Sequence, residues 1–400
     1  METIKWELCN SRRLAVQGAL AWNDGIGKFF QERYQTGIFN TLTYFDGKRT
    51  DYFFDAVQHA EFNRILDNHF DNSEFVLSMI PEAKETLVEK YEFIKNLLVG
   101  FEELSNMELT NLYTKVAHYH TDFYPRKWMA YRICHRIDLQ VEKKLKQLGK
   151  NEEEIKEILR ILSVPLKPNY VFMEKMDLLR LAIKKDQIST EELKENLQDH
   201  VKKYQHMPLF DFDHDPYTNE HFVQELEFIK NSEEELHKLE QTFENREHEF
   251  NQIMKDLNPD RDLRNLLIML KKAVFFRDYA DTIRQKLNFC LREFYLHLGL
   301  KIGLQLEEIV LLTNQEIENH LREGKTFDSN ELEQRKESFL LVQKGEEISI
   351  FSGGEAKTKV NNLKLYPALD ETDVFQGNTA SLGIIKGKAR IIHTNKDLPK

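Results

Sequence analysis

The chain has 400 residues, of which 41% are hydrophobic and 31% charged, and its net charge is −11 at pH 7. This composition excludes a disordered protein and allows two or three domains with a substantial core. The acidic balance also argues against nucleic acid as a partner, because binding to a phosphate backbone requires a net basic surface.

No leader peptide, membrane span or disulfide framework is predicted. The residues after Met1 lack the apolar core of a signal peptide, and two lysines interrupt the longest apolar run, 265–276. The cysteines Cys9, Cys134 and Cys290 are far apart and form no C-x-x-C pair. We therefore expect reduced thiols in a cytoplasmic protein that has no membrane partner.

Residues 1–75 are predicted to form a mixed segment. A short extended start and a helix are expected within 5–31, and a β-hairpin over 37–55. Two runs of aromatic and β-branched residues predict this hairpin. They lie on either side of Asp46 and Gly47, a dipeptide that accepts positive φ in a tight turn.

Residues 76–345 are predicted to form a helical central domain. Helix starts are marked by a capping residue followed three positions later by an acid, a pair that satisfies free amides of the first turn. These pairs are Ser105 with Glu108, Asn151 with Glu154, Ser189 with Glu192, Ser232 with Glu235 and Thr313 with Glu316.

A long antiparallel helical hairpin is predicted over 236–270. Apolar residues in its first helix recur at spacings of three and four, and Arg246 interrupts this seam. The residues Asn258, Pro259 and Asp260 end that helix in a short turn. Such a seam is typical of core packing or of contact with a partner helix, so an assembly role is one alternative.

The periodicity changes near residue 345. Ile348 and Ile350 alternate with polar residues and are followed by Gly353 and Gly354, so we expect a second hairpin that turns at these glycines. This hairpin and an extended linker occupy 346–375. Residues 376–400 then begin another β segment, in which the run K-A-R-I-I-H alternates as a strand does.

No catalytic residue and no metal site is assigned from motifs. Asp211, Asp213 and Asp215 alternate as acids do at the start of a calcium loop, but proline and phenylalanine occupy the positions that require glycine and glutamate. We expect instead a polar loop that caps a helix beginning near Thr218.

The histidines His118, His120 and His135 lack the spacing of a zinc site, so we interpret them as surface and packing residues. The sequence also lacks a glycine loop for nucleotide phosphates and a convincing nucleophile motif.

The glycines near the end of the sequence form a more specific pattern, G-x-x-A-S-x-G-x-x-x-G-x-A-R. It resembles the opening of the swivelling phosphohistidine domain, or mobile domain, of PEP-utilising enzymes such as phosphoenolpyruvate synthase and rifampicin phosphotransferase. The helical stretch 276–321 is similar to the connector before that domain. The residues that match the opening are Gly377, Ala380, Ser381, Gly383, Gly387, Ala389 and Arg390.

The resemblance implies a phosphotransferase. In this family an ATP-grasp domain binds ATP, and a histidine in a T-S-H-A-type loop carries the phosphoryl group to pyruvate or another acceptor, with Mg²⁺ neutralising phosphate charge. The printed sequence has no such loop, and His393 follows the first strands at the wrong place. We therefore expect 376–400 to be a truncated start of the mobile domain, in a chain without activity or cofactor of its own.

The expected partners are an ATP-grasp domain or a full-length partner chain, and a small-molecule acceptor. The alternative is a non-catalytic helical binding or assembly module, related to the acceptor-binding region of rifampicin phosphotransferase. Phe123, Tyr124, Trp128 and Tyr131 would line its pocket, unless they are helix-packing residues. The expected fold class is α+β, predominantly α-helical, with small β-hairpins and the first strands of a swivelling β/α domain.

Overall fold

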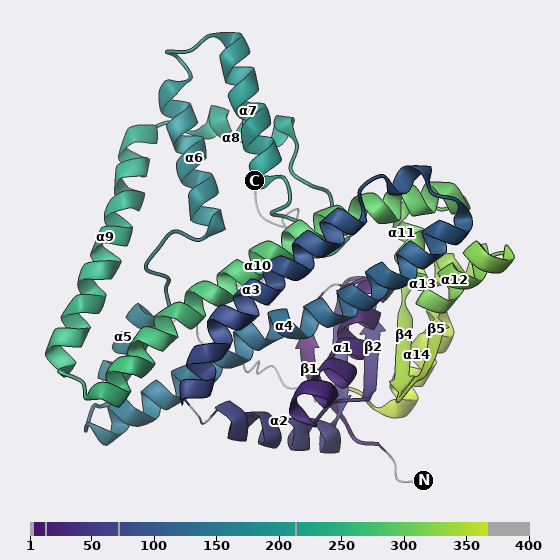
Figure 1. Ribbon diagram of the computed structural model, residues 1–400, viewed down its shortest axis with the longest axis horizontal. Helices are drawn as coiled ribbons and strands as arrows, with labels where there is room; N and C mark the ends of the chain where they lie inside the picture. The colour runs from purple at the N-terminus through teal and green to yellow at the C-terminus, as the bar shows by residue number, and fades with distance from the viewer. Residues whose placement is uncertain (1–3, 13, 71–72, 213, 367–400) are drawn as a thin grey trace, which may run out of the picture. The chain divides into compact units, whose positions relative to one another are not determined.

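The computed structural model describes residues 4–12, 14–70, 73–212 and 214–366 (Figure 1). These residues are predominantly helical and contain one five-stranded antiparallel sheet, which confirms the expected α+β class. All the elements described below belong to one compact unit, Met1–Leu365. The glycine motif and the strands predicted within 376–400 lie outside the described residues.

The sheet joins segments from both ends of the described chain, in the order β1-β3-β2-β4-β5. The central strand is β2, which pairs with β4 so that Leu42 lies opposite Val342. The β2–β3 turn contains Gly47 at φ +92°, which confirms the first predicted hairpin. The strands are β1 (Trp6–Ser11), β2 (Asn40–Phe45), β3 (Thr50–Asp55), β4 (Phe339–Lys344) and β5 (Glu347–Ser352).

The second hairpin differs from its prediction. Its turn is at Gly345, where φ is +62°, and not at Gly353 and Gly354, which begin helix α14 (Gly353–Leu363). The prediction was wrong because β4 is buried along most of its length and its apolar residues are continuous, so it lacks the alternation of a half-exposed strand. The alternating residues belong to β5, the second strand of this hairpin.

The helices account for most of the described chain. They are α1 (Val16–Tyr34), α2 (Ala56–Phe70), α3 (Ser73–Leu97), α4 (Asn106–Gln147), α5 (Glu152–Leu162), α6 (Tyr170–Lys184), α7 (Thr190–Tyr204), α8 (Asn219–Phe228), α9 (Ser232–Leu257), α10 (Arg261–Ile302), α11 (Leu306–Ile309), α12 (Asn314–Glu323) and α13 (Ser329–Glu337), besides α14 and a 3-10 turn at Phe101–Glu103.

Four of the five predicted helix starts are confirmed by hydrogen bonds. Ser105, Asn151 and Thr313 form capping boxes with the acids three residues later, and Ser189 accepts a bond from the amide of Glu192. Ser232 is instead the first helical residue, one position after the N-cap residue. These caps lie at the first turns of α4, α5, α12 and α7, so local sequence determines where these helices begin.

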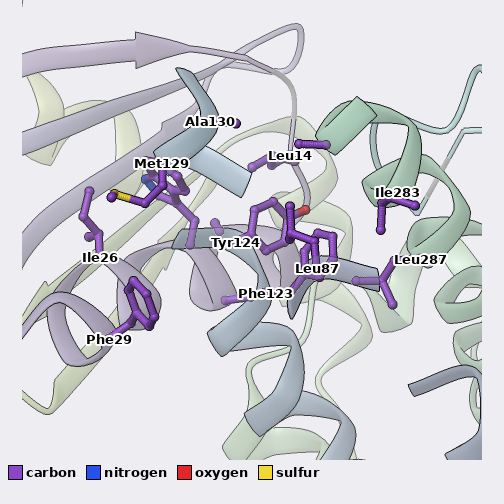
Figure 2. Packing of buried hydrophobic residues seen from close by; sticks show 14 of the residues in the cluster. Leu14, Ile26, Phe29, Leu87, Phe123, Tyr124, Met129, Ala130, Ile283 and Leu287 are labelled. Carbon is purple, nitrogen blue, oxygen red and sulfur yellow. The ribbon is translucent and has the colours of Figure 1, made fainter. Parts of the chain in front are cut away.

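The main core lies among α1, α3, α4 and α10. Figure 1 shows α3, α4 and α10 side by side, and they pack against one another. Figure 2 shows Phe123 and Tyr124 of α4 among Leu87 of α3, Ile26 of α1 and Ile283 of α10. Since these helices come from distant parts of the sequence, their shared core positions residues that are far apart along the chain.

The predicted turn at Asn258 connects the long helices α9 and α10, but the seam of α9 packs mainly against α5 and α6. The rings of Phe172 in α6 and Phe243 in α9 meet edge to face at 5.2 Å. The guanidinium of Arg246 lies 4.6 Å from the centre of the Phe243 ring and donates to the carbonyl of Pro165. The apolar seam is thus covered within this chain.

Among the described helices, none has a stretch both long and apolar enough to cross a lipid bilayer.

Candidate binding site

A cavity of about 280 Å³ lies where the start of α1 and strands β1 and β3 meet α4 and α10. Its wall combines aromatic rings with three cationic side chains. The lining residues are Asn10, Arg12, Leu14, Trp22, Tyr52, Tyr124, Lys127, Trp128, Tyr131 and Arg284. We call it the Lys127 cavity.

One face of α4 supplies much of the wall. Lys127, Trp128 and Tyr131 come three, four and seven positions after Tyr124, so the four residues share a helix face. Three of the four aromatic residues predicted from the sequence therefore line the cavity. Phe123 does not, because it lies on the neighbouring face and is fully buried in the core, as Figure 2 shows.

Two tryptophans from different helices form the aromatic part of the wall. The rings of Trp22 in α1 and Trp128 in α4 meet edge to face, with their centres 6.1 Å apart. Trp128 is also in contact with Phe30, at 5.5 Å between ring centres. Edge-to-face pairs of this kind hold both rings in place, and both tryptophans are among the lining residues.

The cationic groups come from three places in the sequence, and reasoning from the sequence missed them all. Lys127 and Arg284 are buried, whereas Arg12 is half-buried. Asp281 lies beside two of them: its Oδ1 is 3.1 Å from Nζ of Lys127 and 3.2 Å from Nη2 of Arg284. The hydroxyl of Tyr131 donates to the other oxygen of Asp281. The only sequence signal was the position of Lys127 on the aromatic face of α4.

Several polar atoms of the wall lack partners. Within the part of the chain that the structure describes, Nε of Arg284 and the hydroxyls of Tyr52 and Tyr124 are buried without a hydrogen-bond partner. A buried donor without an acceptor costs about 1–3 kcal/mol, more when it is charged. These three atoms are closed off from solvent, so they lie behind the accessible surface of the wall.

Burial and neighbouring charges shift the pKa values of two side chains in the wall. Burial, together with the charges of Arg284 and Arg12, lowers the pKa of Lys127 to about 7, although Asp281 acts in the opposite direction. Burial and the charge of Asp281 raise the pKa of Tyr131 to about 12. The lysine thus titrates near neutral pH, whereas the phenol stays protonated.

The side of α10 next to the cavity also anchors the loop that precedes α8. Arg284 donates to the carbonyl of Phe210 at 2.7 Å, and Asn288 donates to that of Leu209 at 3.1 Å. The next residue, Asp211, is fully buried and accepts a hydrogen bond from the amide of Ala15 at the start of α1. A loop distant in sequence is therefore tied to the residue that precedes the helix carrying Trp22.

The other acids of this loop were predicted to be polar and not metal-binding. Thr218 accepts a hydrogen bond from the amide of His221, which confirms the predicted cap of α8. Asp215 forms an ion pair with Arg292 at 2.8 Å, and Asp213 lies outside the described residues. In residues 4–366, apart from the gaps given above, no group of three or more His, Cys, Asp or Glu side chains is arranged to hold a metal ion.

The histidines predicted to be ordinary packing and surface residues occupy different environments. His120 is buried between Tyr124 and Phe212, and burial lowers its pKa to about 3. His118 is in edge contact with Tyr119, and His135 is exposed. The three histidines do not converge on one site.

The three cysteines are free thiols, and burial raises the pKa of each of them.

A scan against models of known protein families found no match, and a search among curated proteins found none either. The resemblance of the terminal glycine motif to PEP-utilising enzymes thus stays a prediction from the sequence.

Proposed function

We propose that this chain is a small-molecule-binding module, and that the Lys127 cavity receives the acceptor of a phosphotransferase of the PEP-utilising type. The observation that carries the binding part is the convergence of five aromatic and three cationic side chains on one cavity. Convergent polar groups in an apolar hollow are typical of ligand sites. The phosphotransferase part rests on the glycine motif at 377–390.

In such an enzyme the phosphoryl group would travel from ATP through a phosphohistidine to pyruvate or another acceptor. ATP and Mg²⁺ would be bound by other parts of the enzyme, and an ATP-grasp domain or a full-length chain would be the partner. The residues described here would bind and orient the acceptor. Cationic side chains in a site of low dielectric serve this role well, because their attraction for an anion is weakly screened.

Binding is tested by measuring the free energy of unfolding with and without a panel of compounds: pyruvate, a rifamycin, aromatic acids and neutral aromatic amides. A ligand at a hundred times its Kd stabilises the folded state by about 2.7 kcal/mol. We expect at least one compound to do so, and Trp128→Leu to weaken the effect. Phe228→Leu is the matched control, because this ring is exposed and is not among the lining residues. A panel in which no compound changes the stability would refute the binding function.

The phosphotransferase part predicts that the chain alone is not phosphorylated. The protein would be incubated with radiolabelled ATP or PEP and Mg²⁺ and examined for acid-labile label, which is the behaviour of a phosphohistidine. We expect no label above background, because the sequence has no T-S-H-A-type loop. Acid-labile label on His393 would contradict this interpretation.

A further inference from the structure

We infer that the Lys127 cavity binds a planar aromatic acid, whose acidic group is held by Arg12, Lys127 and Arg284 and whose ring lies against Trp22 and Trp128. This inference rests on the proposed binding function of the same cavity and specifies the chemistry of its ligand. The acidic group is a carboxylate or a phosphate, since both are anions with several acceptor oxygens.

The charge balance of the wall favours an anion. Two carboxylates lie near the wall. The oxygens of Asp281 are already shared among Lys127, Arg284 and Tyr131, and the charge of the buried Asp211 acts on Tyr52 and Tyr124. Arg12 brings a further positive charge to the lining. A buried site with more positive than negative groups is stabilised by a ligand of the opposite sign, and the gain is larger than in water because the surroundings are poorly polarisable.

The cationic side chains also favour a ligand with several acceptor atoms. Lys127 and Arg284 share a single oxygen of Asp281, and Arg12 adds a third cation to the lining. A carboxylate or phosphate offers two or more acceptor oxygens to such groups, and hydrogen bonds to a charged acceptor are the strong ones.

The remaining wall favours a ring. Five of the ten lining residues are aromatic: Trp22, Tyr52, Tyr124, Trp128 and Tyr131. A dry cavity of about 150 Å³ is enough to hold benzene. The Lys127 cavity has about 280 Å³, so it has room for one or two fused rings together with an acidic group. A small aliphatic acid would leave much of the aromatic wall without contact.

Binding of an anion should also draw a proton to Lys127. The charged groups that face its ammonium are Asp281 and Arg284 from α10 and Arg12 from the start of the chain. An added negative charge stabilises the protonated amine, so a lysine that is neutral in the free protein above pH 7 takes up a proton when the ligand binds. Affinity should therefore fall as the pH rises from 6.5 to 8.5.

Calorimetric titration of the full chain tests this inference with a matched pair, 2-naphthoate and naphthalene-2-carboxamide. The two have nearly the same shape and differ in charge. We expect the acid to bind at least tenfold more tightly at pH 6.5. Two further probes, 2-naphthyl phosphate and inorganic phosphate, establish which acidic group is preferred and whether the ring is needed. Tighter binding of inorganic phosphate than of both naphthyl acids would overturn the inference that the ligand carries an aromatic ring.

Variants of the cationic groups provide the second measurement. Lys127→Gln should weaken binding of 2-naphthoate about tenfold or more at pH 6.5 and abolish proton uptake at pH 8, which titrations in buffers of different ionisation enthalpy measure directly. Arg12 is half-buried, so the fold tolerates its loss more easily. Arg12→Gln should weaken the binding of 2-naphthoate and leave the binding of naphthalene-2-carboxamide unchanged. Lys115→Gln, at an exposed position of the same helix α4, is the matched control.

The outcomes separate this inference from the proposed function. Equal affinity for the acid and the amide, or unchanged affinity for the acid in Arg12→Gln and Lys127→Gln, would overturn the inference that the ligand is an aromatic acid. The proposal of a binding module would still stand. Failure of every compound in the broader panel, neutral ones and rifamycin included, would remove the binding function itself. The inference is supported if both variants bind 2-naphthoate more weakly but the carboxamide equally well, and if Lys127→Gln takes up no proton on binding.

Discussion

At the scale of single residues, Asp211 connects two segments that are far apart in the sequence. The N-cap residue of α1 is Ala15, and its own amide donates to the carboxylate of Asp211, which lies in a loop 196 residues away. The other oxygen of Asp211 accepts from the amide of Phe212 at 2.9 Å. A fully buried carboxylate that accepts two backbone amides holds both the start of α1 and the loop in place.

Replacement of this carboxylate gives a prediction for stability. Asp211→Ala leaves the amides of Ala15 and Phe212 without their acceptor, so we expect the free energy of unfolding to fall by about 2–3 kcal/mol. Asp211→Asn retains an acceptor oxygen and should lose less. Urea unfolding measures both. Wild-type stability in the alanine variant would show that the bond to Ala15 contributes nothing to the fold.

At the scale of elements, the crossing of α1 and α4 positions the aromatic wall. Gly25 of α1 lies so close to α4 that a Cβ at this position would be 2.6 Å from the carbonyl oxygen of Thr121 and 2.7 Å from the ring of Pro125. Pro125 lacks the amide that would otherwise bond to Thr121, so the bare glycine approaches a carbonyl that the helix leaves free. This close approach brings Trp22 and Trp128 together.

Adding a methyl group at this crossing should separate the two helices. We expect Gly25→Ala to lower the free energy of unfolding by about 1–3 kcal/mol, the usual range for overpacking. Gly354→Ala is the matched control, since a Cβ there meets no atom within 4 Å, and it should be neutral or stabilising by up to about 1 kcal/mol. Thermal and urea unfolding distinguish the two. Equal effects in both variants would rule out a steric role for Gly25.

At the scale of the whole molecule, buried histidines connect stability to pH. Burial lowers the pKa of His120 to about 3 and that of His206 to about 4, from an ordinary value of 6.5. Both rings stay neutral in the folded state while the unfolded chain binds protons below pH 6.5. Their contribution to stability is therefore complete above this pH and is lost as the pH falls toward 3 or 4.

The expected loss can be measured. Between pH 7.5 and 5.5, each of these histidines should reduce the free energy of unfolding by about 1.4 kcal/mol, because the unfolded form is then mostly protonated. In His120→Phe the free energy of unfolding should fall by about 1.4 kcal/mol less between these two pH values, because one of the two histidines is gone. An unchanged slope in that variant would mean that His120 is not held neutral in the fold.

Local sequence determined the elements whose hydrogen bonds join residues only a few positions apart. The pairs headed by Ser105, Asn151 and Thr313 specify helix starts, and Asp46 with Gly47 specifies a turn, whatever the rest of the chain does. The turn at Gly345 was misplaced because a strand buried on both faces loses its alternating pattern.

Only the tertiary structure decided the composition of the cavity. The resemblance to rifampicin phosphotransferase suggested Phe123, Tyr124, Trp128 and Tyr131 as pocket residues, and the spacing along α4 puts only the last three on the helix face that lines the cavity. Arg12 and Arg284 join them through the pairing of distant strands and the packing of α10 on α4, contacts between segments that no short-range pattern connects. A helix repeat specifies which residues share a face, whereas the partner of that face depends on how the whole chain buries its apolar surface.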